Sequence, residues 1–243
     1  MEYNKQELIE RYSKYLDRMC NDLGFYEIFY EAYDVEDAVA AWERSYEMED
    51  EFNCWFANGC TRLVMGDDNC DYVIKFQRPC DEIDYGVIEY NIYRDAVAAG
   101  YADKFVWCDH LMAYEYEGDI INVYVYKYAQ CSYDMISDDS YDYHFRSFCE
   151  QEGLDMNSDD AREEWYKRDG EYTSTRAMLE FAGNFWHMNR EQMTEFVNFL
   201  SKHHVNDLHC GNWGYDDNML VLTDYAGYGQ FCERSDIIHY AFR

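Results

Sequence analysis

Two short segments in the last fifth of the chain carry side chains that suit phosphate and metal chemistry. In the first, Asp207 precedes Asn212 by five residues. In the second, a hydrophobic strand leads to Asp224, which is followed closely by Gly227. Magnesium prefers carboxylate, carbonyl and water oxygens, so Asn212 and Asp224 are candidate ligands from two adjacent loops. Asp207 is a candidate to receive or orient a hydroxyl proton.

These two segments resemble the catalytic loop and the Asp-Phe-Gly segment of the protein-kinase-like superfamily. The family places an Asn five residues after the catalytic Asp, and an Asp-Phe-Gly element after a hairpin. Here the second element reads Asp224-Tyr225-Ala226, with an aromatic residue after the Asp and with Gly227 one place late. The resemblance implies a site for ATP and Mg²⁺ in which Asn212 and Asp224 are the metal ligands.

A separate part of the same family pattern lies upstream. The family has a lysine on the third strand of its sheet, and residues 71–76 predict a strand with Lys75 as its single basic residue. The resemblance implies that Lys75 holds the α and β phosphates of ATP. A glutamate on the next helix should pair with this lysine; Glu89 is our choice and Glu82 the alternative. Lys75, Glu89 and Asp207 are therefore the expected catalytic residues.

Two loops depart from the family pattern. The phosphate loop, which should read Gly-x-Gly-x-x-Gly, retains only Gly59, although this glycine still permits a tight turn. Arg62 is either a substitute anion ligand or a charge at a strand edge, and the expected nucleotide-binding set is Gly59, Arg62 and Lys75. His209 stands two residues after Asp207, where Ser/Thr protein kinases have lysine. This form looks more like aminoglycoside and choline phosphotransferases and small atypical bacterial or phage kinases.

The elements that must position these residues are predicted from hydrophobic spacing. Apolar residues recur with helical spacing in four segments, which are 5–24, 34–50, 82–99 and 174–203. Short apolar runs bounded by turn residues predict six strands, which are 53–58, 62–65, 71–76, 110–116, 120–128 and 219–223. A turn is expected at 66–69. The polar, tyrosine-rich stretch 132–170 predicts helical fragments and loops.

The order of these elements predicts an α+β fold. With the family resemblance, it becomes a two-lobed protein-kinase-like fold. Its N-lobe has a five-stranded antiparallel sheet, its C-lobe is reduced and mostly helical, and a helical extension precedes both. The expected boundaries are 1–50 for the extension, 51–130 for the N-lobe and 131–243 for the C-lobe.

The composition narrows the class of protein. Of 243 residues, 48% are hydrophobic and 19% aromatic, which is typical of a folded globular chain. Asp and Glu total 50 against 20 Lys and Arg, so the net charge of −30 repels nucleic acid and anionic membranes. The sequence contains neither a membrane span nor a secretory signal, and its ten cysteines form no C-x-x-C pair. A reducing cytoplasm is the expected location.

Two classes of function remain open. The first is an ATP- and Mg²⁺-dependent phosphotransferase that acts on a protein hydroxyl or a small molecule; nucleotidyl transfer would use the same site. The second is a binding protein: a catalytically weak pseudokinase, or an acidic DNA mimic that inhibits a basic, nucleic-acid-binding partner. The charge and the single loop glycine favour this second class. Zinc is a minor alternative, because four clustered residues match no common spacing: His203, His204, His209 and Cys210.

Overall fold

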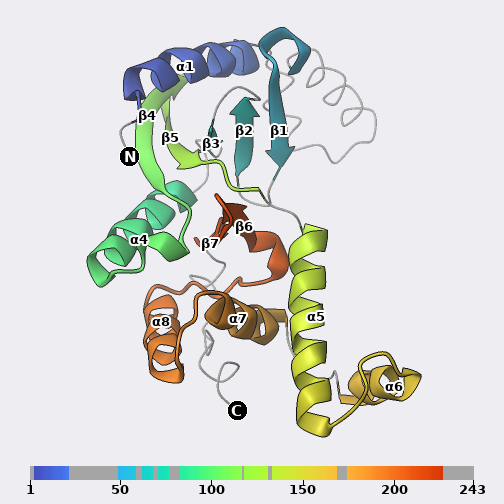
Figure 1. The fold of residues 1–243 in the computed structure, drawn as a ribbon. Helices are drawn as coiled ribbons and strands as arrows, with labels where there is room; N and C mark the ends of the chain where they lie inside the picture. The colour runs from blue at the N-terminus through green and yellow to red at the C-terminus, as the bar shows by residue number, and fades with distance from the viewer. Residues whose placement is uncertain are drawn as a thin grey trace. The chain divides into compact units, whose positions relative to one another are not determined.

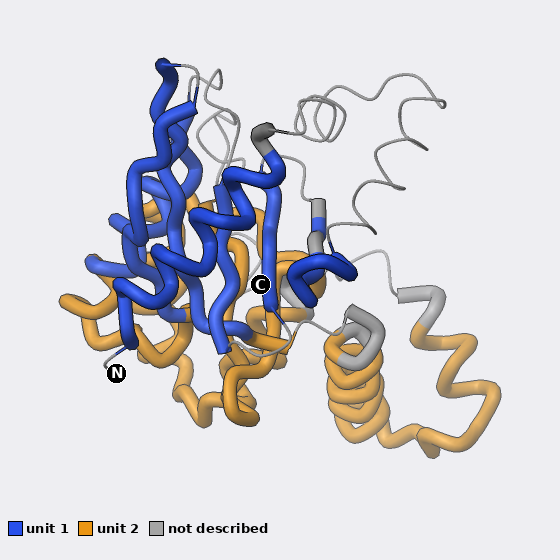
Figure 2. Tube along the Cα trace, turned by 90° about the horizontal axis from the view of Figure 1, so that it is seen from above, with its two compact units in different colours: residues 1–94, 107–128 blue, residues 95–106, 129–243 orange. Residues whose placement is uncertain are grey.

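The computed structural model describes residues 3–21, 49–58, 62–67, 71–76, 83–116, 118–130, 133–168 and 174–226. They form an α+β protein with two compact units (Figure 2). Unit 1 comprises residues 1–94 and 107–128, and unit 2 comprises residues 95–106 and 129–243. Most of the helix predicted over 34–50 lies outside the described residues, as do Gly59, Glu82 and Gly227.

Unit 1 is built on a five-stranded antiparallel sheet with the strand order β1-β2-β3-β5-β4. In chain order the strands are β1 (Cys54–Asn58), β2 (Leu63–Asp67), β3 (Tyr72–Phe76), β4 (Cys108–Tyr116) and β5 (Asp119–Lys127). The predicted meander and the following hairpin are confirmed. Gly118 turns the β4–β5 hairpin with a φ of 95°, a conformation that favours glycine.

The turn predicted at 66–69 is wrong in its first half. Gly66 and Asp67 belong to β2, where Gly66 pairs with Trp55 on one side and with Val73 on the other. A Cβ atom at Gly66 would lie 2.2 Å from the Trp55 ring. Glycine is therefore needed at this position because the Trp55 indole packs directly against the strand, and not because the chain turns.

Side-chain alternation gives this sheet two faces. Helix α1 (Lys5–Asn21) lies along one of them and buries its apolar stripe there (Figure 1). The main members of this core are Leu8, Tyr12, Leu16, Met19, Leu63, Met65, Ile74, Phe76, Val123 and Val125. The predicted N-terminal helix is thus part of the core of unit 1.

Helix α4 (Tyr85–Ala99) packs on the opposite face. Its first turn approaches β5 so closely that a Cβ atom at Gly86 would lie 2.2 Å from the Tyr124 ring. Tyr124 pairs with Lys75 across β5 and β3, so both side chains point to the face that carries α4. From Asp95 onward the residues of α4 count with unit 2.

Unit 2 contains four described helices and one hairpin. The helices are α5 (Tyr133–Glu152), α6 (Asp159–Arg168), α7 (Ser174–Phe185) and α8 (Arg190–Lys202). The hairpin joins β6 (Trp213–Asp216) to β7 (Met219–Leu222). None of the helices in the described ranges is both long enough and apolar enough to cross a membrane.

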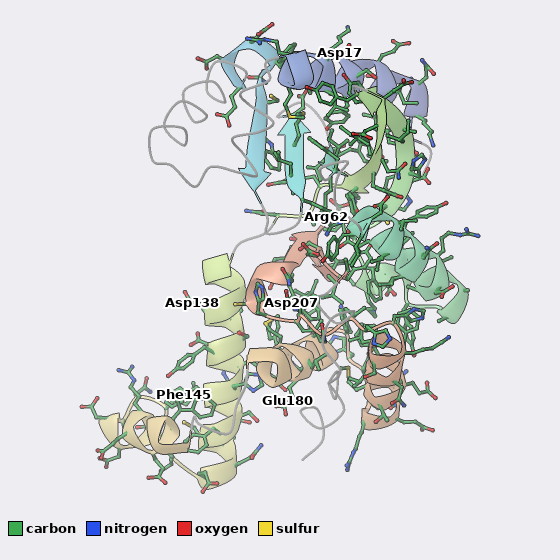
Figure 3. The ribbon with its side chains drawn as sticks, turned by 180° about the vertical axis from the view of Figure 1, so that it is seen from behind. Asp17, Arg62, Asp138, Phe145, Glu180 and Asp207 are labelled. Atoms are coloured by element: carbon green, nitrogen blue, oxygen red, sulfur yellow. The ribbon has the colours of Figure 1, made fainter. Side chains whose placement is uncertain are left out.

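The stretch 132–170 is more regular than predicted. It forms α5, which is 20 residues long, and α6, and the two helices share a small aromatic core. Phe145 lies where the helices meet (Figure 3), with Phe148 and Trp165 beside it. Tyr141, Phe145 and Phe148 recur at helical spacing, so the signal was present among the polar residues.

The single long helix predicted over 174–203 is wrong. The chain leaves the helical conformation after Phe185, and His187 adopts a positive φ of 54°. Asn189 then starts α8 with a capping box: its Oδ1 accepts the Gln192 N–H at 3.0 Å, and Gln192 Oε1 accepts the Asn189 N–H at 2.9 Å. The Asn-x-x-Gln spacing is a recognised start signal, which the continuous apolar periodicity obscured.

Candidate functional site

Lys75 is held on the face of the sheet that carries α4. It pairs with Val64 of β2 and Tyr124 of β5, and its side chain is nearly buried. Its Nζ lies 3.7 Å from Glu89 Oε2 and 4.5 Å from the centre of the Tyr126 ring. The structure therefore brings Lys75 and Glu89 together, whereas Glu82 is outside the described residues.

Glu89 has a closer cationic partner, which sequence reasoning missed. Arg62 Nη1 donates to Glu89 Oε2 at 2.6 Å and lies 3.3 Å from the Tyr126 hydroxyl oxygen. Arg62 is 3% exposed and Glu89 is fully buried. The two residues are 27 positions apart on different elements, so no local spacing could have revealed the pair. The role of Arg62 as an anion ligand stays a prediction.

Electrostatics keep Glu89 ionised. Burial alone would raise the pKa of Glu89, but the charges of Arg62 and Lys75 outweigh it, and hydrogen bonds from Arg62 and Tyr126 add to them. The net effect is a pKa well below the ordinary glutamate value. Burial, together with the charge of the same carboxylate, raises the pKa of the Tyr126 hydroxyl. The cluster thus combines one buried carboxylate with two cations.

Asp207 lies in the loop that follows α8 in unit 2 (Figure 3). Val205 and Leu208 are completely buried and fix this loop on either side of Asp207, whose side chain is 30% exposed. The Asn212 side-chain amide donates from Nδ2 to the Asp207 carbonyl oxygen at 2.8 Å. The predicted Asp207 and Asn212 are therefore joined directly.

Asn212 also contacts the segment that carries Asp224. Its carbonyl oxygen accepts the backbone N–H groups of Thr223 at 2.9 Å and of Asp224 at 3.5 Å. The hairpin between them turns through Asp217 and Asn218, with φ values of 48° and 67°. Two such residues make the tight turn that matches the twist of paired strands. The structure therefore joins the backbones of Asn212 and Asp224, the two predicted metal ligands.

The donor set suits magnesium. Because the Asp207 carbonyl can only accept, the Asn212 atom that contacts it is the amide nitrogen, and Oδ1 is the acceptor end. An amide oxygen and the Asp224 carboxylate are hard oxygen ligands. Magnesium usually takes one or two carboxylates and completes its shell with phosphate oxygens and water.

The alternative zinc site is not assembled. Within the described ranges, no three His, Cys, Asp or Glu side chains gather in a way that could hold a metal. His203, His204, His209 and Cys210 all lie in those ranges. His203 instead packs against Phe199, with ring centres 4.5 Å apart and the ring planes tilted by 43°.

Tyr225 anchors the end of this segment. It is completely buried, its hydroxyl donates to the Val106 carbonyl oxygen at 3.1 Å, and its ring centre lies 5.1 Å from that of Phe105. The Val106 N–H in turn donates to the Leu222 carbonyl oxygen at 2.8 Å. The backbone on both sides of Asp224 is therefore fixed.

The expected site residues fall into two groups. Lys75, Glu89 and Arg62 gather in unit 1, and Asp207, Asn212 and Asp224 gather in unit 2. Comparison with models of protein families, with curated proteins and with solved structures finds no match to this chain. Function is therefore inferred from the geometry of these two groups of residues.

Proposed function

We propose that the chain is an ATP- and Mg²⁺-dependent phosphotransferase of the protein-kinase-like type. In this proposal unit 1 is the N-lobe, with its five-stranded antiparallel sheet, and unit 2 is a reduced C-lobe. In protein kinases both lobes supply residues that act on one nucleotide, and the proposal assigns one group of site residues to each unit. The acceptor is a hydroxyl of a protein or of a small molecule.

The observation that carries the proposal is the Lys75–Glu89 pair. A buried lysine on the third strand faces a fully buried glutamate on the next helix, with 3.7 Å between Nζ and Oε2. Removing charged groups from water costs several kcal/mol per ion, so a buried cluster of this kind is expensive as a purely structural device. The arrangement is the one that prepares a lysine for the α and β phosphates in kinases.

The second support comes from unit 2. Asn212 joins the loop of Asp207 to the segment of Asp224 through three hydrogen bonds of 2.8, 2.9 and 3.5 Å, from its side chain and to its carbonyl oxygen. This sets a general base and two oxygen ligands in one small region. Such an arrangement suits a reaction in which positioning and charge stabilisation do most of the catalysis.

In the proposed reaction, Asp207 accepts the proton of the acceptor hydroxyl. The hydroxyl oxygen forms a bond to the γ-phosphorus, the bond from that phosphorus to the β–γ bridging oxygen breaks, and ADP leaves. Lys75 binds the α and β phosphates and stabilises the negative charge, while Glu89 fixes Lys75. Bound magnesium would neutralise phosphate charge, and Asn212 and Asp224 would hold it.

The decisive experiment compares γ-labelled with α-labelled ATP, with and without magnesium. We expect label from the γ position only, on the chain itself, on an added acceptor or as released phosphate, and only with magnesium. Label from the α position would indicate nucleotidyl transfer instead. Absence of both label and nucleotide binding would contradict the proposal.

A binding protein is the second candidate, favoured by the net charge of −30. Exposed carboxylates occur on both α5 and α6, at Asp138, Asp142, Asp159 and Asp160. Such a surface suits a basic, nucleic-acid-binding partner. Capture from lysate should then recover nucleic-acid-binding proteins, with recovery falling steeply as salt rises. Recovery that is insensitive to salt would contradict this candidate.

A further inference from the structure

His209 lies beside Asp207, the proposed base, and the proposed function assigns it no role. It precedes the short 3₁₀ helix Cys210–Asn212 and caps it: its Nδ1 accepts the Gly211 backbone N–H at 3.1 Å. Its other ring nitrogen, Nε2, lies 3.6 Å from Asp207 Oδ1. One imidazole therefore contacts a backbone donor on one side and the proposed base on the other.

The cap determines the protonation of the ring. A nitrogen that accepts a hydrogen bond carries no proton, so Nδ1 is unprotonated in this arrangement. The ring proton of the neutral imidazole must then be on Nε2, the atom that faces the Asp207 carboxylate. The local backbone thus selects the tautomer that presents an N–H donor to Asp207.

From this geometry we propose that His209 is the positioning residue of Asp207. Its Nε2–H holds one carboxylate oxygen, Oδ1, and so directs the other oxygen to the acceptor hydroxyl. The separation of 3.6 Å exceeds a good hydrogen bond, and such contacts often shorten only when the substrate binds. The inference rests on the proposed phosphotransferase function and adds a named residue to it.

Two substitutions separate the two contacts of His209. In His209→Asn, the side-chain oxygen occupies the place of Nδ1 and keeps the cap, because Asn is a favoured residue at helix N-termini, while the Nε2–H is lost. In His209→Gln, the longer amide reaches the place of Nε2 and keeps a donor for Asp207, but the cap is weakened. His187→Asn is the matched control, since His187 is an exposed histidine whose positive φ suits Asn.

The assay is magnesium-dependent release of phosphate from γ-labelled ATP, with water as the acceptor. For His209→Asn we expect kcat to fall between about 10- and 100-fold, with KM for ATP and the melting temperature unchanged. His209→Gln should recover part of kcat despite its weaker cap, and His187→Asn should match the wild type. Long-range ¹H–¹⁵N spectra should show His209 protonated at Nε2.

Several results would overturn the inference. Wild-type kcat in His209→Asn would show that Asp207 needs no such partner, and protonation of His209 at Nδ1 would contradict the tautomer. Equal losses in His209→Asn and His209→Gln, in proportion to their loss of folded protein, would make the residue a cap only. These results leave the proposed function intact. A wild-type protein without any phosphate transfer would overturn both.

Discussion

The contacts of Glu89 join residues that are far apart in the sequence, and much of the candidate site depends on contacts of this kind. Lys75 and Glu89 could be nominated from their places on a strand and the following helix. Arg62 was nominated as an anion ligand, but its pairing with Glu89 could not be predicted, because the packing of α4 on the sheet and not sequence spacing selects this partner. His209 was visible in the sequence, but its two contacts depend on the path of the backbone at Gly211.

The first prediction concerns Arg62. Substitution Arg62→Met leaves Glu89 buried with only its more distant cation, so the free energy of unfolding should fall by about 3 kcal/mol. Urea unfolding followed by circular dichroism measures this change. Arg94→Met is the control. Arg94 lies on α4, the helix that carries Glu89, but it is exposed, so its loss should change stability by less than about 0.5 kcal/mol. Equal effects in both variants would contradict the assignment.

The second prediction concerns pH. The pKa of Glu89 is lower in the folded protein than the ordinary value of about 4.3 in an unfolded chain. As pH falls, the unfolded chain therefore protonates Glu89 before the folded protein does. Ionised Glu89 stabilises the fold above about pH 4.3, and this stabilisation is lost as pH falls below that value. Melting temperatures of wild type and Glu89→Gln should differ most at neutral pH and converge in acid. A constant difference would show that the Glu89 charge does not contribute.

At the scale of elements, the sequence predicted β1 to β5 and β7 well, missed β6 and placed several helix ends poorly. The strands β1 to β5 are short apolar runs between turn residues, and each lies within a few positions of its prediction. The prediction of one helix over 174–203 failed because apolar spacing continues across the break, although α7 ends at Phe185 and a capping box at Asn189 and Gln192 starts α8. Hydrophobic periodicity indicates which face of a helix is buried, whereas side-chain caps determine where the helix begins and ends.

The third prediction concerns the contact of α4 with the sheet. A methyl group at residue 86 would collide with the Tyr124 ring, so Gly86→Ala should push α4 from β5 and cost about 1–3 kcal/mol. The same shift should weaken the Lys75–Glu89 pair, since Glu89 follows one turn later. Adding Tyr124→Ala should remove the collision, so a double-mutant cycle in urea unfolding should give a favourable coupling between the two changes. Strictly additive losses would contradict this contact.

At the scale of the whole molecule, the α+β class followed from the order of elements in the sequence. The kinase-like prediction requires more than either unit provides alone, because in it residues of both units must act on one nucleotide. Sequence could nominate the two groups, because each has its own motif. Only ligand binding can show that they cooperate.

The fourth prediction tests this cooperation. Magnesium and ATP at 100 times the Kd should stabilise the native protein by about 2.7 kcal/mol and raise its Tm by several degrees. Lys75→Met in unit 1 and Asp224→Asn in unit 2 should each remove most of this rise. Asp217→Asn, in the exposed hairpin turn, should keep it. A rise that depends on one unit alone would contradict a shared nucleotide.

The packing of α1 on the sheet also has a consequence for the order of events during synthesis. The partners of this helix arrive late: Tyr3 bonds Asp109 and Asp17 accepts from Tyr114, across 106 and 97 positions of chain. At about 5–20 residues per second, the ribosome needs roughly 5–20 seconds to deliver them. For that interval α1 has β2 and β3 as core partners but lacks β4 and β5, so part of its apolar stripe faces solvent. Nascent chains stalled before β4 should therefore recruit chaperones, and chains released after β5 should not.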